Sequence, residues 1–310
     1  MPFTKSKRYK DYSSFIKKKF SERVQKISLD TGFTCPNRDG SKGVGGCTYC
    51  NNNTFNPYYC KPSKSITAQL NEGIQFFSKK YKTQKYLAYF QAYTNTYAEI
   101  DLVKELYLEA INHPEVIGLV IGTRPDCIQE NLVDFLAELA KDYYISLEFG
   151  IESTLNRSLE LVNRCHTFEE TQAAYDLAKN KGIHLGGHLI IGLPGESREE
   201  ILNHAKAVSL LPIDSLKLHQ LQVVKHTKMA LQLKENPSMF QLFSVEDYVD
   251  LISDFVSCLR SDIIIERFIS ESPSHLLIAP KWGGLKNFEL VSKIDKAMME
   301  KDLWQGKNYK

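Results

Sequence analysis

Two short stretches of the chain decide how the rest of it is interpreted: residues 29–40, LDTGFTCPNRDG, and residues 45–50, GGCTYC. They place Cys35, Cys47 and Cys50 on one loop. Cysteine thiolates are the ligands that iron–sulfur clusters and zinc prefer in proteins. A [4Fe–4S] cluster that is held by three cysteines keeps one iron free for a small-molecule ligand. The loop therefore predicts an iron–sulfur cluster with one open iron.

A structural zinc site is the alternative interpretation of the same loop. Zinc needs a fourth ligand, and the first histidine is the distant His113, so only Cys60 is close enough in sequence. Structural zinc sites usually pair two Cys-x-x-Cys hooks, and this stretch has one. The role of Cys60 stays open. Three further cysteines are expected to be structural: Cys127, Cys165 and Cys258.

The cluster loop resembles that of radical S-adenosylmethionine (SAM) enzymes. Eleven residues separate its first two cysteines, a wide spacing, and the aromatic Tyr49 stands directly before the last one, as in that superfamily. The resemblance implies that SAM binds the open iron and that Tyr49 belongs to its binding site.

Length and composition are those of an ordinary globular protein. The chain has 310 residues, of which 43% are hydrophobic and 25% charged, and barrels of 200 to 250 residues often form one domain. The basic, polar N-terminus and the lack of any run of eighteen apolar residues argue against a signal peptide and a membrane span. The odd number of seven cysteines predicts a cytoplasmic protein.

Repeated strand–helix units predict the architecture. Six apolar or alternating runs indicate strands, and helical periodicity follows them, which favours a parallel sheet with right-handed crossovers. We therefore expect an α/β fold, a partial (β/α)6 barrel with its chemistry at the carboxyl ends of the strands. Strands are expected at 24–29, 86–93, 116–123, 144–151, 184–193 and 215–224, and helices at 66–77, 99–112, 132–139, 168–182 and 197–210.

The ends of the chain are expected to extend this barrel. We predict a basic N-terminal extension over residues 1–23, the core barrel with a following helix and strand over 24–273, and a helical C-terminal extension over 274–310. The later elements are helices near 245–260 and 286–303 and a strand-like segment at 263–269.

Positive charge is concentrated at the N-terminus. Residues 1–26 hold nine lysines and arginines, Lys5 among them, against Asp11 and Glu22; this is a local charge of +7, so the rest of the chain carries −5 of the net +2. Such a segment, interleaved with aromatic residues, is able to bind RNA phosphates. A solvated amphipathic helix that caps the barrel explains it equally well.

Polar side chains follow the second predicted strand. Gln91, Thr94 and Asn95 form a cluster that is costly to bury without partners. In many radical SAM enzymes a Gly-Gly-Glu motif at this place holds the methionine amino group, and this chain lacks it. These three residues are candidate substitutes, and an ordinary polar turn is the alternative.

The fourth predicted strand offers two carboxylates. Glu148 and Glu152 are four residues apart and share one face, because side chains alternate along a strand. Ribose hydroxyls are suitable partners for such carboxylates. The following Arg164 is a candidate clamp for the methionine carboxylate, with a surface ion pair as the alternative.

The fifth and sixth predicted strands complete the site. The turn Gly-Leu-Pro-Gly-Glu at 192–196 resembles the adenine-contacting turn of the same enzymes, with Ile190, Gly192 and Leu193 as candidate contacts. On the sixth strand, Lys217 and His219 share a face. If that face points into the barrel, both are candidate catalytic residues because their protonation is tunable; a structural role is the alternative.

Four segments in this order, GFTCPNRDG, GTRPD, GLPGE and LKLHQLQVVK, resemble the YhcC/YtqA-type radical SAM proteins, relatives of the elongator catalytic subunit, from about residue 24 to 273. No segment after 273 is long enough for the acetyltransferase domain of those relatives. The resemblance implies a [4Fe–4S] cluster that receives an electron from a donor such as flavodoxin or ferredoxin and cleaves SAM to a 5′-deoxyadenosyl radical.

The resemblance to the elongator branch, which modifies the wobble uridine of transfer RNA, implies this uridine as the substrate. We expect the basic N-terminal segment to hold the RNA and the enzyme to convert 5-carboxymethylaminomethyluridine to 5-aminomethyluridine. A flexible anticodon-loop base reaches a buried site more easily than a paired one. Two alternatives remain: a radical SAM enzyme that acts on a small metabolite, and a non-catalytic cluster or zinc module that senses or binds RNA.

Overall fold

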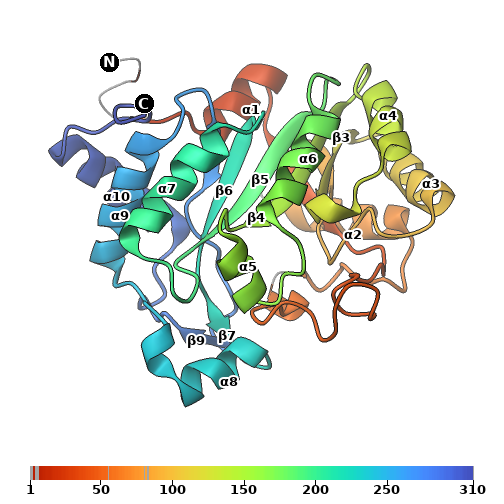
Figure 1. Ribbon diagram of the computed structural model, residues 1–310. Coiled ribbons are helices and arrows are strands. Elements are labelled where there is room, and N and C mark those ends of the chain that lie inside the picture. Colours follow the sequence, from red (N-terminus) through yellow and green to blue (C-terminus); the bar gives the residue numbers. More distant parts are fainter. Residues whose placement is uncertain (1–2, 4–6, 55, 80, 82–83, 310) are drawn as a thin grey trace.

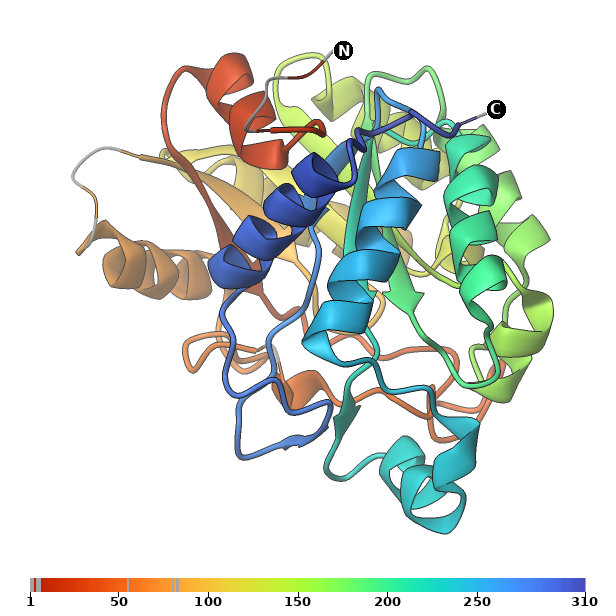
Figure 2. The same ribbon diagram turned by 90° about the vertical axis from the view of Figure 1, so that its left-hand side faces the viewer.

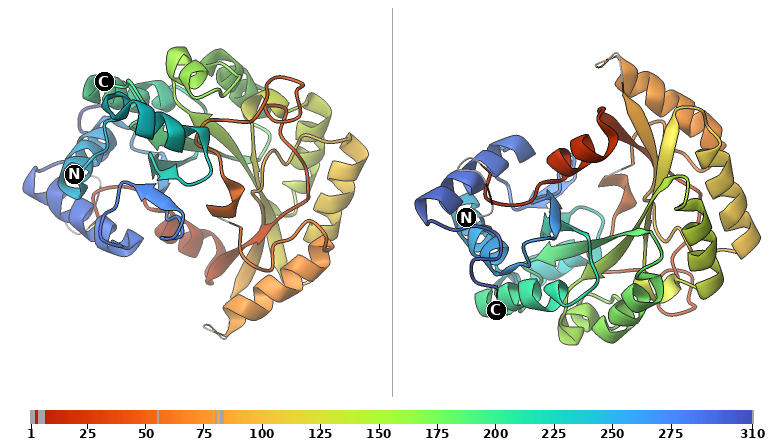
Figure 3. Two further views of the ribbon diagram at one scale, coloured as in Figure 1. Left: turned by 90° about the horizontal axis from the view of Figure 1, so that it is seen from below. Right: turned by 90° about the horizontal axis from the view of Figure 1, so that it is seen from above.

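A computed structural model describes residues 3, 7–54, 56–79, 81 and 84–309. Its centre is a parallel sheet of seven strands that lie side by side in sequence order (Figure 1). Viewed nearly along its strands, the sheet curves into an open half-barrel with helices on its outer face (Figure 3). The strands are β1 (Val24–Leu29), β2 (Lys85–Phe90), β3 (Val116–Thr123), β4 (Tyr144–Glu152), β5 (His184–Ile191), β6 (Ser215–Gln220) and β8 (Ile264–Arg267).

The predicted α/β half-barrel is confirmed, with one addition. The expected strand near 263–269 is β8, and it pairs in parallel with β6 as a seventh strand. The sixth predicted strand ends earlier than expected, at Gln220, because Val223 and Val224 form β7 and pair instead with β9 (Leu277–Ala279) in a separate antiparallel ribbon. The domain boundaries at 23 and 273 stay a prediction.

Helices cover the outer face because each presents an apolar stripe to the sheet. The connecting helices are α2 (Ile66–Ser78), α3 (Ile100–Ile111), α4 (Glu130–Leu139), α5 (Asn156–Leu161), α6 (Phe168–Ala178), α7 (Arg198–Ser209) and α9 (Val245–Cys258), with α8 (Lys228–Glu235) beside the small ribbon. The last helix, α10 (Asn287–Glu300), packs on α9, which packs on α7 (Figure 2). No helix in the described part of the chain is long and apolar enough to cross a membrane.

The N-terminal helix α1 (Tyr12–Phe20) lies near the two outermost strands, β1 and β8. Asp11 caps its first turn by accepting a hydrogen bond from the backbone N–H of Ser14, and Ile265 of β8 donates its backbone N–H to Lys10. The helix is at the opposite end of the molecule from the β7–β9 ribbon (Figure 1).

Candidate active site

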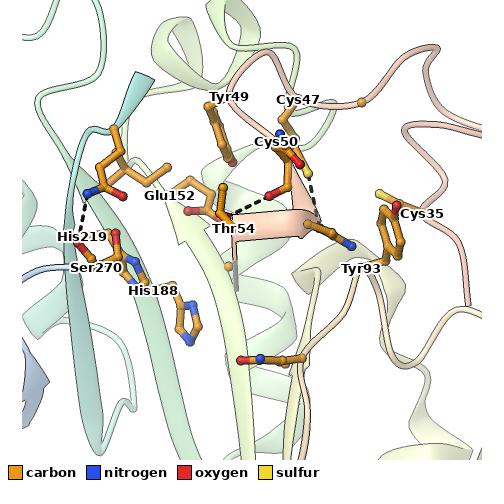
Figure 4. Close-up of a pocket in the computed structure, with 18 of the residues that line it drawn as sticks. Cys35, Cys47, Tyr49, Cys50, Thr54, Tyr93, Glu152, His188, His219 and Ser270 are labelled. Atoms are coloured by element: carbon orange, nitrogen blue, oxygen red, sulfur yellow. Dashed lines mark hydrogen bonds between the residues drawn. The ribbon is translucent and has the colours of Figure 1, made fainter. Parts of the chain in front are cut away.

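One cavity of about 320 Å³ opens at the carboxyl ends of the strands. Figure 4 shows the cysteine loop on one side of it and His188 and His219 on the other. Of the residues predicted from the sequence, the cavity is lined by Cys35, Cys47, Tyr49, Cys50, Gln91, Thr94, Glu148, Glu152, Arg164, Ile190 and His219. The other four predicted residues do not line the cavity: Asn95, Gly192, Leu193 and Lys217.

The three loop cysteines face this cavity. Cys35 and Cys47 are buried and Cys50 is half-buried. Burial and the neighbouring Cys47 raise the pKa of the Cys50 thiol to about 12, so metal loading must displace its proton. In the described part of the chain, no three His, Cys, Asp or Glu side chains stand ready in a metal-coordinating array. The fit to a cluster therefore rests on the donor set, three thiols of one loop that line one cavity.

Cys60 lies elsewhere, in the main hydrophobic cluster, which also includes Ile27 and Leu29, and is not a lining residue. Burial and Asp30 raise the pKa of its thiol to about 12. This environment suits a structural thiol rather than a fourth metal ligand.

Arg164 connects the cysteine loop to strand β4. Its guanidinium donates hydrogen bonds to Cys47 Sγ at 3.7 Å and to the Gly150 carbonyl at 3.0 Å, and it lies 3.6 Å from the Glu152 carboxylate. Glu152 has a φ of +64° next to an irregularity in the β4–β5 register, and its side chain lines the cavity. Both side chains are thus held at one wall of the cavity.

Several buried polar atoms of the cavity have no hydrogen-bond partner among the described residues. They are Tyr49 Oη, Asn52 Nδ2, Thr94 Oγ1, Arg124 Nη1, Arg164 Nε and His219 Nε2. Buried polar groups normally have partners, so this set indicates a polar ligand. The amino, carboxylate and ribose groups of SAM are chemically suited to this set apart from His219, which lies on the side of the cavity opposite the cysteine loop.

Three of the predicted SAM contacts lie outside the cavity lining and have structural neighbours instead. The Asn95 side chain donates to the Gly122 carbonyl at 2.8 Å and so joins the ends of β2 and β3. Leu193 belongs to the same apolar cluster as Ile190, and Tyr49 packs against this cluster. Gly192 has a φ of +89°, and a Cβ at this position would lie 2.8 Å from the Phe243 ring. The roles of these residues toward SAM stay predictions.

A buried charge network forms the floor of the cavity. The Glu148 carboxylate accepts from Lys217 and, at 3.1 Å, from Lys26 of β1, and His188 Nε2 lies 3.0 Å from it. Glu266 of β8 pairs with Lys26 at 2.7 Å and with Lys217 at 3.3 Å. The network joins strands from both edges of the sheet.

The network also sets the protonation of its members. Burial alone would raise the pKa of Glu148, but Lys217 and Lys26 outweigh it and hold this pKa well below its usual range. Burial lowers the pKa of Lys217 to about 8. Sequence analysis predicted Glu148 and Lys217 but missed Lys26, His188 and Glu266, because alternation along one strand does not reveal which strands become neighbours.

Burial gives the protein an acid-sensitive histidine. Burial and the positive charge of Arg164 lower the pKa of His166 from 6.5 to about 3. Between these values the unfolded chain binds a proton that the folded protein excludes, so stability falls as pH drops below about 6.5. Between pH 7 and 5, the free energy of unfolding of the parent should fall by up to about 2 kcal/mol more than that of His166→Gln. Urea unfolding at both pH values measures the difference.

The exposed His275 provides the control for this measurement. His275→Gln should keep the parent's pH dependence, because its imidazole is not withdrawn from solvent. An unchanged slope in His166→Gln would show that other groups govern the acid sensitivity.

Fold and site together define an enzyme of the radical SAM type. A family model described as the Radical SAM superfamily matches residues 34–208, and one described as the Radical SAM C-terminal domain matches residues 213–300. YtqA of Bacillus subtilis is 33% identical over 301 residues, which cover 97% of this chain and 92% of YtqA. YhcC of Escherichia coli K12 is 34% identical over 86% of this chain and 85% of YhcC. The chain belongs to the radical SAM family that includes YtqA and YhcC.

More distant proteins share the fold. The structure of Methanocaldococcus infernus Elp3 with an N-terminal deletion superposes with a TM-score of 0.68 at 21% identity, over 92% of this chain and 64% of that one. A tRNA uridine(34) acetyltransferase of the same organism is 26% identical over 60% of this chain and 34% of its own length. Membership of the superfamily brings the [4Fe–4S] cluster and SAM as cofactors, and with them the need for an electron donor.

Proposed function

We propose that this enzyme converts the 5-carboxymethylaminomethyl group of the wobble uridine in transfer RNA to 5-aminomethyl. Two similarities support this substrate: one to a protein named for tRNA uridine 34, and one in fold to Elp3. The observation that carries the proposal is the two-sided cavity, which has polar groups for SAM near the cysteines and a second polar wall around His188 and His219.

Within this proposal, Cys35, Cys47 and Cys50 would hold the cluster, which together with SAM would supply the radical chemistry for removing a hydrogen atom from the substrate. Overall, the substrate carboxymethyl group leaves as glyoxylate: substrate, SAM and water give 5-aminomethyluridine, glyoxylate, methionine, 5′-deoxyadenosine and a proton. SAM is the two-electron oxidant, and flavodoxin or ferredoxin is the proposed source of the priming electron.

The chain's own residues position these partners. Arg164 and Glu152 bind SAM from one wall, Gln91, Thr94 and Tyr49 add polar contacts, and Ile190 offers an apolar surface for adenine. All seven cysteines are free in the structure, which suits the reducing cytoplasm where transfer RNA is modified.

The direct test compares modified nucleosides in transfer RNA from cells with and without the gene. We expect 5-carboxymethylaminomethyluridine to accumulate and 5-aminomethyluridine to disappear when the gene is absent. In vitro, the purified enzyme should form 5-aminomethyluridine and 5′-deoxyadenosine in equal amounts. An unchanged nucleoside profile, together with no turnover of modified RNA, would redirect the search to small metabolites.

SAM affinity tests the assigned contacts. A charge-assisted hydrogen bond contributes roughly 1.5 to 3 kcal/mol, so Arg164→Gln and Glu152→Gln should each weaken SAM binding by about tenfold or more, as measured by anaerobic calorimetry. Iron content should stay at the parent level. The exposed Arg157, which forms an ion pair with Glu200, offers a matched control. Arg157→Gln should bind SAM with the affinity of the parent. Parent-like affinity in both cavity variants would remove them from the SAM site.

In the structure, fewer cations of the N-terminal segment are available to bind RNA than the sequence indicated. Lys5 lies outside the described residues. Lys7 and Arg8 pair with aspartates of the C-terminal segment, Lys10 donates to the Asp262 carbonyl, and Lys26 belongs to the buried network. Lys17, Lys18 and Lys19 are exposed on α1, but α1 lies at the amino ends of the strands and the cavity at their carboxyl ends.

These three lysines give the docking test. Each neutralised phosphate contributes a salt slope of about −0.9 on duplex RNA regions, so replacing all three by glutamine should flatten the slope of transfer RNA binding by up to about 2.7. Iron content and substrate-free SAM cleavage should be unchanged. A slope equal to that of the parent would place RNA docking at the cavity mouth instead, where Arg38 is exposed.

A further inference from the structure

The wall of the cavity that faces the cysteines carries a positively charged side chain, that of Arg267. Arg267 is the last residue of β8, is paired in register with Lys217 of β6, and lines the cavity. As far as the structure describes the chain, its guanidinium makes no hydrogen bond or ion pair. Withdrawing a guanidinium from water is costly unless it is paired, so an anionic ligand from outside the chain would stabilise Arg267.

A comparison of charges around Arg267 supports this view. Lys26 and Lys217 are balanced by Glu148 and Glu266 in the buried network. The other buried arginines of the cavity are also paired, Arg164 with Glu152 at 3.6 Å and Arg124 with Asp126 at 2.9 Å. The exposed Glu271 at the rim accepts a hydrogen bond from the backbone of Asn287. Glu266 acts on Arg267 only at longer range, so among the described residues Arg267 has no carboxylate at ion-pair distance.

Two histidines beside Arg267 add hydrogen-bonding capacity. The rings of His188 and His219 are stacked, with centroids 5.2 Å apart and an interplanar angle of 24°. His188 is anchored by Glu148 at 3.0 Å, whereas the buried His219 Nε2 has no partner among the described residues. Stacking on an anchored ring fixes His219, so its free nitrogen is presented to a ligand in a defined direction.

The segment after Arg267 is fixed by a set of amide contacts. Gln220 accepts from the Ser270 backbone N–H at 2.9 Å and donates to its carbonyl at 3.0 Å, and Gln222 donates to the same carbonyl at 3.1 Å. Ser272 donates to Gln222 at 2.6 Å. Such contacts hold β6 and the end of β8 in a fixed relation, as a preorganised binding site requires.

We propose that Arg267 and His219, with His188 behind it, form a subsite that binds the carboxylate of the substrate. A guanidinium fork matches a carboxylate in bidentate geometry, and the His219 nitrogen supplies a further hydrogen bond. The identity of the substrate rests on the proposed function, in which the 5-carboxymethylamino group carries the carboxylate. An RNA phosphate is the other source of this anionic chemistry, and the test separates the two.

The test compares two synthetic anticodon stem-loop RNAs, one with 5-carboxymethylaminomethyluridine and one with 5-aminomethyluridine. Both carry the same phosphates, and only the first has the carboxylate. The parent holoenzyme should bind the first about tenfold more tightly, and Arg267→Gln should remove this preference while it keeps the parent's iron content and SAM affinity. Arg267→Lys should keep part of the preference. Arg198→Gln, a substitution of an exposed arginine outside the cavity, should keep all of it.

The outcomes separate the subsite from the proposed function. A preference that persists in Arg267→Gln overturns the subsite and leaves the proposed function standing. An equal loss of affinity for both RNAs assigns Arg267 to a phosphate and also overturns the carboxylate subsite.

If the parent binds neither RNA, the proposed function falls and the subsite is tested with N-methylglycine, which mimics the carboxymethylamino group alone. Saturation-transfer NMR should then detect N-methylglycine on the parent and on Arg198→Gln but not on Arg267→Gln. Absence of the signal from the parent, or its persistence in Arg267→Gln, overturns the subsite.

Discussion

Replacing Cys35, Cys47 or Cys50 by alanine should abolish both iron binding and SAM cleavage. The reconstituted parent should bind about four irons, and each variant should fall to near zero because two thiolates do not hold the cluster against solvent. The three thiols line one cavity and no other cysteine lines it, so we expect no other thiol to replace a lost ligand. Iron and sulfide analysis, with chromatography of 5′-deoxyadenosine after reduction, measures both effects.

Cys60→Ala and Cys258→Ser are the matched controls. Cys60 is packed in the hydrophobic core and Cys258 ends helix α9, so both variants should keep the full iron content. Loss of iron from Cys60→Ala in a protein that remains folded by circular dichroism would revive the four-cysteine zinc or iron site.

The second large effect is expected at Glu148. Removing its carboxylate leaves Lys26 and Lys217 buried with only Glu266 to compensate them. Breaking a buried ion pair by deleting one partner costs about 3–5 kcal/mol. Glu148→Ala should therefore lower the midpoint of urea unfolding strongly, and Glu148→Gln, which keeps the shape but not the charge, should lower it nearly as much.

A double variant provides the control for charge balance. Lys217→Met combined with Glu148→Gln removes one charge of each sign, so it should be more stable than either single variant. The same proteins test the sequence-based assignment of Glu148 to the ribose of SAM. Parent stability with a tenfold loss of SAM affinity in Glu148→Gln would favour the ribose contact over the structural ion pair.

Sequence patterns predicted the half-barrel because each long strand alternates with a helix of clear periodicity. They did not place β8 in the sheet, since its four residues pair with β6 and periodicity does not reveal a distant partner. Motif positions located the cysteines, Arg164 and Glu152 at one cavity. The charge network could not be predicted for the same reason. Its members come from four different strands, and periodicity does not reveal which strands become neighbours: Lys26, Glu148, Lys217 and Glu266.

For the basic N-terminus, the sequence overestimates the number of cations that are available to a ligand. A charge count over residues 1–26 treats every lysine and arginine alike, but in the fold several of them meet acidic or carbonyl partners far along the chain. The number of cations available to a ligand depends on those long-range contacts, which composition does not contain.

The contact between Lys10 and Ile265 has a consequence for any truncation. In a sheet that does not close on itself, the last strand exposes backbone groups that other chains can pair with. Ile265 donates its backbone N–H to the Lys10 carbonyl, so the N-terminal segment occupies the outer edge of β8, and the lysines of α1 repel a second sheet. Deleting residues 1–20 would uncover this edge and invite edge-to-edge association of the enzyme, which a binding assay alone would mistake for loss of an RNA contact.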